Sequence, residues 1–241
     1  MKSTGGNEYN LSERVSQHLV KYIQDHELRS GDKMPSEVQI SSDLGISRGV
    51  VRQAYHSLRT AGILEVAMGR SPRVGKLNGS AFIPFLQHAL NTEQVSPLDV
   101  LELRCAVEVH AAELAANNRT PAHIEALRKT VEGMRQTQHE PDRFVRHDVR
   151  FHEILGKATG NRLFEILSRA LRGSLETSIR AGLRSRTNPA QIARVVDTHE
   201  AIVDAVESRQ QSRARNMMAV HFDDAKNALQ QAATSARRTA G

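Results

Sequence analysis

Four residues in the C-terminal half of the sequence have side chains and a spacing that could bind a metal ion. Asp148 and His152 are four residues apart, so on a helix they lie on the same face, one turn apart. His199 and His221 stand on two later predicted helices. Carboxylate and imidazole ligands together suit zinc, nickel, iron or manganese, and helical bundles build such sites from facing helices. The spacing alone is also consistent with chance, because the chain contains 11 histidines.

A second group of residues has the charge expected for binding nucleic acid. From Gly45 to Lys76 the sequence contains six cations and one acid, Glu65, which gives a net charge of +5 within a total of +6 for the chain. Arg48 and Arg52 are again four residues apart, so both can meet one groove of DNA, where arginine bonds guanine or neutralises phosphate. A basic surface without a partner is the alternative interpretation.

Composition favours a helical protein of two domains. A chain of 241 residues is longer than one small module. Its content of 39% hydrophobic and 25% charged residues predicts a packed core. Aromatic residues make up only 4%, without tryptophan, which argues against a β-sandwich. The single cysteine, Cys105, excludes an intramolecular disulfide framework and a thiolate zinc cluster. Because no apolar run has the length of a membrane span and residues 1–10 lack a signal segment, we expect a cytoplasmic protein with no membrane partner.

Local signals in the N-terminal third predict a winged helix-turn-helix. Ser36 and Ser47 are helix caps, while Gly45 separates the two helices and Gly62 ends the second. Free N–H groups at the start of the helix that Ser47 caps also favour phosphate binding. Helices are predicted at 11–28, 36–44 and 47–61, and short β segments at 63–66 and 72–75, around a tight turn at 68–70.

The remaining sequence predicts an antiparallel helical bundle, so the fold class is mainly α with a small β-wing. Ser96-Pro97 combines a cap with proline at the first helical position, and no internal repeat indicates a solenoid. Helices are predicted at 96–117, 120–140, 141–160, 161–183, 188–208 and 211–233, with fraying from 235. The expected domains are a DNA-binding domain at 1–77, a linker at 78–95 and an effector-binding and dimerisation domain at 96–241.

Several spaced motifs in the first domain agree with one another. They are Gly31 to Glu37, Leu44 to Arg48, Val51-Arg52, Leu58, Gly62 to Leu64 and Gly69-Arg70. This pattern resembles the DNA-binding domain of the GntR family of bacterial transcription regulators. The resemblance implies that a homodimer binds an inverted-repeat operator on double-stranded DNA, with the wing tip in the minor groove. Val38 and Met68 depart from the arginine and histidine common in the family, which bears on the operator sequence. The implied DNA-binding residues are Ser47, Arg48, Gly49, Arg52, Gly69 and Arg70.

Motifs of the second domain carry a further resemblance. They are Leu103-Arg104, Glu108, Leu114 to Ala116, Asp148-x-x-x-His152 after Phe144 and with Phe151 adjacent to the histidine, Gly160-Asn161, His199 and His221. Over about residues 97–225 this pattern is similar to the FCD effector domain of the FadR branch. The resemblance implies a divalent metal, with zinc favoured over nickel, iron or manganese, held by Asp148, His152, His199 and His221.

The same resemblance implies that Arg104 binds the carboxylate of an effector. Its alternative is a solvated pair with Glu108 at i, i+4. Further candidates for the pocket, each with a helix surface as the alternative, are Arg146, His147, Arg150, Arg172, Ser174, Thr177 and Ser178.

Together these features predict a ligand-responsive transcription regulator, not an enzyme, in which a small carboxylate on the metal alters DNA affinity. One alternative is a regulator for which the metal itself is the signal. Another is a metal-dependent hydrolase fused to a DNA-binding domain, against which no additional general base or nucleophile stands out in the sequence. Non-specific coating of DNA is disfavoured, because such a protein needs no effector pocket.

Overall fold

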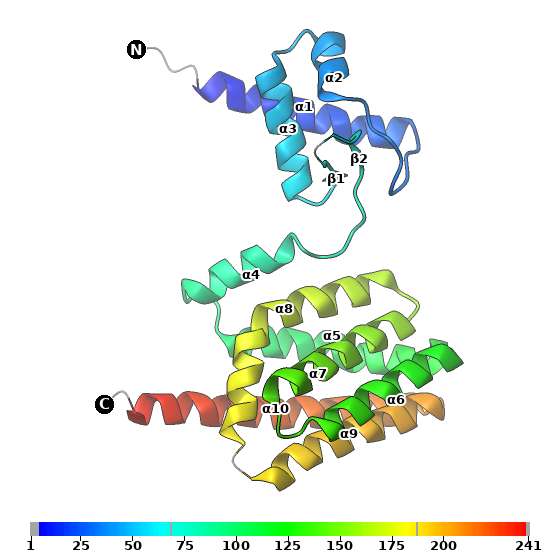
Figure 1. The fold of residues 1–241 in the computed structure, drawn as a ribbon, viewed down its shortest axis with the longest axis vertical. Helices are drawn as coiled ribbons and strands as arrows, with labels where there is room; N and C mark the ends of the chain where they lie inside the picture. Colours follow the sequence, from blue (N-terminus) through cyan, green and yellow to red (C-terminus); the bar gives the residue numbers. More distant parts are fainter. Residues whose placement is uncertain (1–4, 68, 187, 240–241) are drawn as a thin grey trace. The chain divides into compact units, whose positions relative to one another are not determined.

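The computed structural model describes residues 5–67, 69–186 and 188–239, and the chain divides into two compact units between Ala81 and Phe82 (Figure 1). Within these ranges it contains ten helices and one two-stranded sheet. The predicted fold class, mainly α with a small β-wing, is confirmed. None of the described helices is both long and apolar enough to cross a membrane.

The first unit contains helices α1 (Gly5–Asp25), α2 (Glu37–Leu44) and α3 (Arg48–Thr60). Ser36 and Ser47 cap α2 and α3 as predicted, because their hydroxyls accept from Gln39 N at 3.1 Å and Val50 N at 3.5 Å. Gly45 takes the left-handed conformation that ends α2, with φ 64°. Helix α1 begins before the predicted residue 11 and ends before residue 28, since apolar spacing marks the packed part of a helix and not its ends.

The wing is shorter than predicted. Strands β1 (Leu64–Glu65) and β2 (Arg73–Val74) pair antiparallel, with Leu64 opposite Val74. The segment before α2 adds a partner for β2, because Val74 N donates to Asp32 O at 2.9 Å. A backbone segment distant in sequence therefore fixes the base of the wing. Met68, in the turn, lies outside the described residues.

One apolar core holds the first unit together. Tyr55 is buried on α3 and donates its hydroxyl hydrogen to Pro35 O at 2.6 Å, which ties α3 to the segment leading into α2. The opposite side of α3 stays exposed, so the core fixes which face the helix presents to solvent. The other buried apolar residues are Val15, Leu19, Met34, Ile40, Val50, Val51, Ala54, Leu58 and Leu64.

The second unit is a helical bundle. Ser96, Thr120, Asn161 and Asn188 each cap the helix that follows them, as predicted. Its last helix does not fray at 235 but continues to Thr239. The helices are α4 (Phe82–Asn91), α5 (Pro97–Asn118), α6 (Pro121–Gln136), α7 (Pro141–Ala158), α8 (Arg162–Ser185), α9 (Pro189–Glu207) and α10 (Gln211–Thr239).

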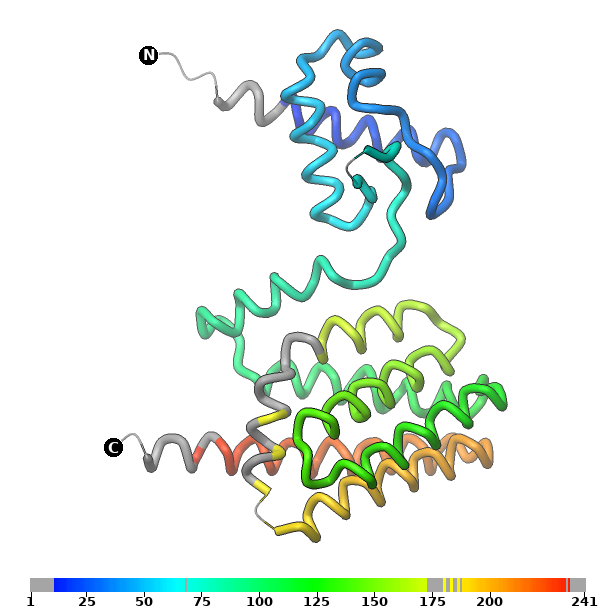
Figure 2. Tube along the Cα trace, viewed as in Figure 1, coloured from blue at the N-terminus to red at the C-terminus, as the bar shows by residue number. Residues whose placement is uncertain are grey.

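Helix α4 occupies much of the segment expected to be a linker. It packs against α8, and Leu86 and Leu90 contact a small cluster formed by Val100 and Leu171. Figure 2 shows α7 lying between α6 and α8, while α10 packs along α5 and α9. The small residues Ala112, Ala115 and Ala116 of α5 are fully buried in the main core. This close packing surrounds an unusual group of buried charges.

Candidate functional site

Among the described side chains of the second unit, six ionisable ones are buried, each no more than 6% exposed. Such residues are seldom fully buried unless they are paired, because burial of a charge is costly. The six come from four different helices, so the fold brings them together from distant parts of the sequence. They are Arg104 and Glu108 of α5, Asp148 and His152 of α7, Arg172 of α8 and His199 of α9.

Three histidines form a compact cluster, here called the histidine cluster. His152, His199 and His221 offer ligand nitrogens that all lie within 4.8 Å of one another. Their rings stand at 41° to 89° to one another, and the ring centroids are 4.6 to 5.6 Å apart. The structure therefore brings the three predicted histidines together from α7, α9 and α10.

Contacts at the Nδ1 atoms of His199 and His152 orient the Nε2 atoms of both rings toward Asp148. His199 Nδ1 lies 2.7 Å from Val195 O, and His152 Nδ1 contacts Glu108 Oε2. Asp148 Oδ1 lies 3.0 Å from His199 Nε2 and 3.7 Å from His152 Nε2. Neither Nε2 makes a well-formed hydrogen bond within the described part of the chain, although both are buried. Such unsatisfied nitrogens next to a carboxylate fit a metal ion.

The charge states of the cluster also suit a metal. Burial raises the pKa of the Asp148 carboxyl, but the Arg172 charge and the adjacent nitrogens of His152 and His199 outweigh it and hold this pKa well below its usual range. Burial, reinforced by the neighbouring His199 and His152, holds the pKa of His221 well below its ordinary value. At neutral pH the carboxylate is therefore charged and His221 is neutral, the forms that metal ligands need.

A relay of contacts connects Arg104 to the histidine cluster. Arg104 Nε donates to Glu108 Oε1 at 2.8 Å, and Glu108 Oε2 contacts His152. Burial raises the pKa of Glu108, but the Arg104 charge and the contact with His152 together outweigh it and hold this pKa well below its usual range. Arg104 does form the ion pair with Glu108 that the sequence offered as an alternative, but its side chain is only 3% exposed. It lies in the interior and not on a solvated face.

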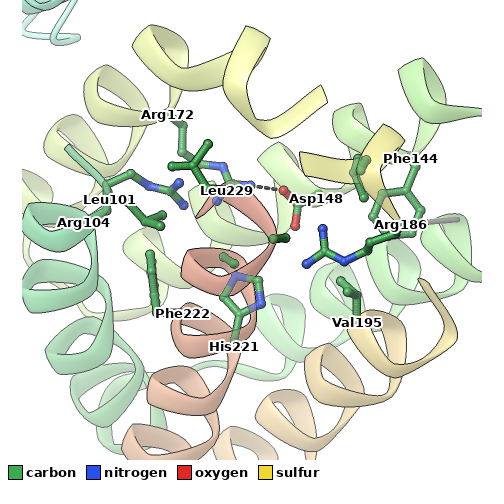
Figure 3. Close-up of a pocket in the computed structure, with 13 residues that line it drawn as sticks. Leu101, Arg104, Phe144, Asp148, Arg172, Arg186, Val195, His221, Phe222 and Leu229 are labelled. Atoms are coloured by element: carbon green, nitrogen blue, oxygen red, sulfur yellow. Dashed lines mark hydrogen bonds and ion pairs between the residues drawn. The ribbon is translucent and has the colours of Figure 1, made fainter. Parts of the chain in front are cut away.

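A cavity of about 70 Å³ opens beside the cluster (Figure 3). Asp148 and His221 line it together with the cations Arg104, Arg172 and Arg186, and its other walls are apolar. The arginines thus stand next to the candidate metal ligands. The apolar lining residues are Leu101, Phe144, Leu183, Val195, Phe222, Ala225, Ala228 and Leu229.

Two arginines that line the cavity, Arg172 and Arg186, have no clear signal in the sequence. Arg172 was one of several cations for which a helix surface was the alternative, yet its side chain is 2% exposed and contacts Asp148 Oδ2. Its position beside Leu171, on the packed side of α8, is a weak signal that periodicity alone does not resolve. Arg146 and Arg150 are exposed, and His147 is half-buried. The side chains of Ser174, Thr177 and Ser178 lie outside the described residues.

In the first unit, the candidate DNA-binding residues of α3 are exposed. Arg48 and Arg52 stand one turn apart on the helix, and a side chain at Gly49 would meet no atom within 4 Å, so this face is open. Arg52 Nε lies 3.6 Å from Glu37 Oε2, while its side chain stays 70% exposed. Ser47 is exposed, and its hydroxyl caps the start of α3.

The other two candidates lie in the wing turn. Gly69 has a φ of 73°, a left-handed conformation in which glycine is favoured. Gly69 and Arg70 are both exposed, so the turn presents backbone and one cation to solvent.

Comparisons with known proteins identify both units. The family described as "Bacterial regulatory proteins, gntR family" matches residues 11–74. The FCD domain family matches residues 99–224, and this second match alone covers more than half of the chain. The chain belongs to the gntR family and carries an FCD domain. This GntR-family protein is therefore a DNA-binding transcription regulator and not an enzyme, and the resemblance noted in the sequence is confirmed.

Relatives of this GntR-family regulator include repressors and solved structures. It is 28% identical over 216 residues to the HTH-type transcriptional repressor NanR of Citrobacter rodentium, covering 88% of this chain and 83% of that protein. A Streptococcus agalactiae GntR structure is 25% identical with a TM-score of 0.65, covering 90% of this chain and 99% of the other. A GntR family member from Pseudomonas syringae pv. tomato shares the fold, with 19% identity, a TM-score of 0.52 and coverage of 97% and 90%.

Proposed function

We propose that this GntR-family regulator binds an inverted-repeat operator as a homodimer and responds to a small carboxylate bound in its FCD domain. Each subunit presents one recognition helix, so a symmetric dimer fits a symmetric pair of half-sites. Because the similar curated proteins from Citrobacter and Salmonella are named repressors, repression is the proposed outcome of binding. The proposed DNA-binding residues are Ser47, Arg48, Gly49, Arg52, Gly69 and Arg70.

The proposed effector site combines a divalent metal with Arg104. Asp148 and the histidine cluster would hold the metal, and three imidazoles with one carboxylate favour zinc, with nickel, iron and manganese as alternatives. When bound, the metal supplies a positive charge on which a carboxylate can replace water. Arg104 lines the adjoining cavity and offers a guanidinium that matches a carboxylate in shape.

One observation carries this proposal. The Nε2 atoms of His152 and His199 are buried beside Asp148 without well-formed hydrogen bonds in the described part of the chain. An arrangement without a ligand would leave these polar atoms unsatisfied at a cost of about 1–3 kcal/mol each. The cations that line the neighbouring cavity favour a ligand-responsive regulator over one that senses the metal alone.

Native mass spectrometry combined with metal analysis tests the proposal. We expect a dimer that carries one metal per chain, and a His152→Ala, His199→Ala double variant with strongly reduced occupancy. His139→Ala is the matched control, because His139 is exposed in the turn between α6 and α7. Full occupancy in the double variant would remove this site from consideration. A monomer that binds an operator half-site with full affinity would contradict the proposed dimer.

A further inference from the structure

The exposed face of α3 carries a row of basic side chains, and one acidic side chain lies against this row. Four exposed residues follow one another at spacings of three or four, which places them along one side of the helix: Arg48, Arg52, His56 and Arg59. Glu37, the first residue of α2, approaches the row, because its Oε2 atom lies 3.6 Å from Arg52 Nε. A carboxylate here repels the phosphates of DNA, so binding driven by charge alone would be stronger without it.

The fold holds the Glu37 carboxylate at this position. The Ser36 hydroxyl caps α2 one residue earlier, and the Tyr55 hydroxyl donates to Pro35 O, which ties the start of α2 to α3. The Glu37 side chain is 28% exposed, and it lines a surface pocket together with Arg52 and Tyr55. Burial and, after it, the negative charge of Glu37 raise the pKa of the Tyr55 hydroxyl above its usual value. The carboxylate is therefore held between the core of the unit and the row of basic side chains.

The contact with Glu37 leaves the outer end of Arg52 available. The Arg52 side chain is 70% exposed, and the carboxylate faces its Nε atom at a distance longer than a hydrogen bond. The two terminal nitrogens of an arginine can bond O6 and N7 of a guanine bidentately in the major groove. An arginine that is already oriented loses less conformational freedom on binding than a free one. Because exposed ion pairs contribute little to folding stability, this pair supplies orientation rather than stability.

We propose that Glu37 is a positioning residue for DNA recognition, which directs Arg52 toward a guanine in each operator half-site. The inference rests on the proposed function, because it assigns a role within the proposed recognition surface. Arg48 has no ion pair with a described residue, so the effect of Glu37 should be confined to the base that Arg52 reads. The carboxylate weakens binding to every DNA sequence by repulsion, and it offsets this loss at sequences that carry the guanine.

A different role for Glu37 is the stabilisation of α2. An acidic side chain in the first turn of a helix interacts favourably with the helix dipole, and Glu37 is the acid in the first turn of α2. Glu37→Asp separates the two roles. Aspartate keeps the charge in the first turn, but its side chain is one methylene shorter, so the contact with Arg52 should open beyond the distance of an ion pair.

Selection from a library of random duplex DNA tests the inference on the full-length protein, since it needs no known operator. Sequencing of the bound DNA gives the base preference at every position, and Arg52→Ala shows which position Arg52 reads. We expect the wild type to prefer guanine there by at least about tenfold, the discrimination that a bidentate contact provides. Glu37→Gln and Glu37→Asp should both lower this preference below about threefold. Preferences at the other positions should stay as in the wild type.

Binding to DNA of unselected sequence gives a second readout, which should change in the opposite direction. Glu37→Gln removes one negative charge beside the phosphates, so its affinity for a duplex of scrambled sequence should rise in fluorescence anisotropy at fixed salt. Asp43→Asn is the matched control, because Asp43 is exposed on the same helix and loses the same charge. This variant should keep the wild-type guanine preference.

The possible results separate this inference from the proposed function. A wild-type guanine preference in Glu37→Gln or in Glu37→Asp would overturn the positioning role and leave DNA recognition by α3 standing. A relaxed preference at every position, together with weaker binding to scrambled DNA, would show a structural role and overturn the inference as well. If Arg48→Ala relaxes a position and Arg52→Ala relaxes none, the inference fails alone. If neither arginine variant relaxes any position, the proposed recognition surface fails with it.

Discussion

The two units use arginine in opposite ways. On α3, Arg52 has a side chain 70% exposed and only a long contact to Glu37. In the bundle, Arg104 and Arg172 have side chains 3% and 2% exposed, and each contacts a buried carboxylate. An exposed cation costs little in folding and remains available to a large polyanion. A buried cation must be paired, and it can recognise only a molecule small enough to enter.

The largest expected loss of stability follows from removing one partner of a buried ion pair. Glu108→Ala leaves Arg104 and His152 without their shared carboxylate, and such a change typically costs about 3–5 kcal/mol of unfolding free energy. Chemical denaturation of the metal-free protein measures it. Glu102→Ala is the control on the same helix, because Glu102 pairs at the surface with Lys226 and should change stability by less than about 0.5 kcal/mol. Equal losses in both variants would contradict the contrast between buried and exposed pairs.

Removal of the metal should cause the next-largest loss of stability. A ligand at 100 times its dissociation constant stabilises the folded state by about 2.7 kcal/mol, so chelation should lower stability by this order. In calorimetry the change should be confined to the transition of the bundle, because the histidine cluster lies entirely in that unit. An equal shift of the DNA-binding unit, or no shift, would contradict this assignment.

Exposed arginines should affect DNA binding without affecting stability. Arg48→Ala and Arg52→Ala should each weaken operator binding by about 1–3 kcal/mol if the residue contacts a base. Neither should lower the melting temperature measurably, since both residues are exposed. Fluorescence anisotropy at fixed salt gives the affinity, with Lys129→Ala, an exposed residue of the second unit, as control. Wild-type affinity in both variants would show that α3 is not the recognition helix.

The smallest predicted effect is a pH dependence of the chelated bundle. Burial holds the pKa of His221 below its ordinary value, so between the folded and unfolded pKa values the unfolded chain binds a proton that the folded chain does not. Stability should therefore fall as the pH drops below about 6.5, by up to about 1.4 kcal/mol per pH unit. Thermal melts at pH 7.5 and 5.5 measure the effect, and His221→Asn should reduce it. A chelated protein that is more stable at pH 5.5 would contradict the sign.

Local signals predicted much of the architecture. Ser36, Ser47 and Ser96 were recognisable as helix caps because capping depends on residues close in sequence, and the structure shows each cap. Helix ends were less predictable: α10 continues to Thr239 beyond the expected end at 233. The pairing of β2 with the segment around Asp32 was not expected, because it joins residues distant in sequence.

The candidate site shows the same limit more clearly. The resemblance to a known family indicated the histidines and Arg104, whereas sequence spacing alone could not separate a buried Arg104–Glu108 pair from a solvated one. Burial depends on which helices cover α5, and this is a property of the tertiary structure. Arg172 was harder still, since its partner Asp148 is 24 residues away on another helix. The contacts that orient the metal ligands were therefore visible only in the folded protein.

We propose that the buried site of the FCD domain controls the exposed DNA-binding surface. Operator affinity of the full-length metal-loaded protein, measured by anisotropy with and without the tightest-binding organic acid, tests it most directly. We expect a change in Kd of at least about fivefold in the wild type, within the usual range of allosteric coupling. We expect no change in the His152→Ala, His199→Ala variant. An operator affinity that the acid leaves unaltered, or alters equally in both proteins, would contradict the claim.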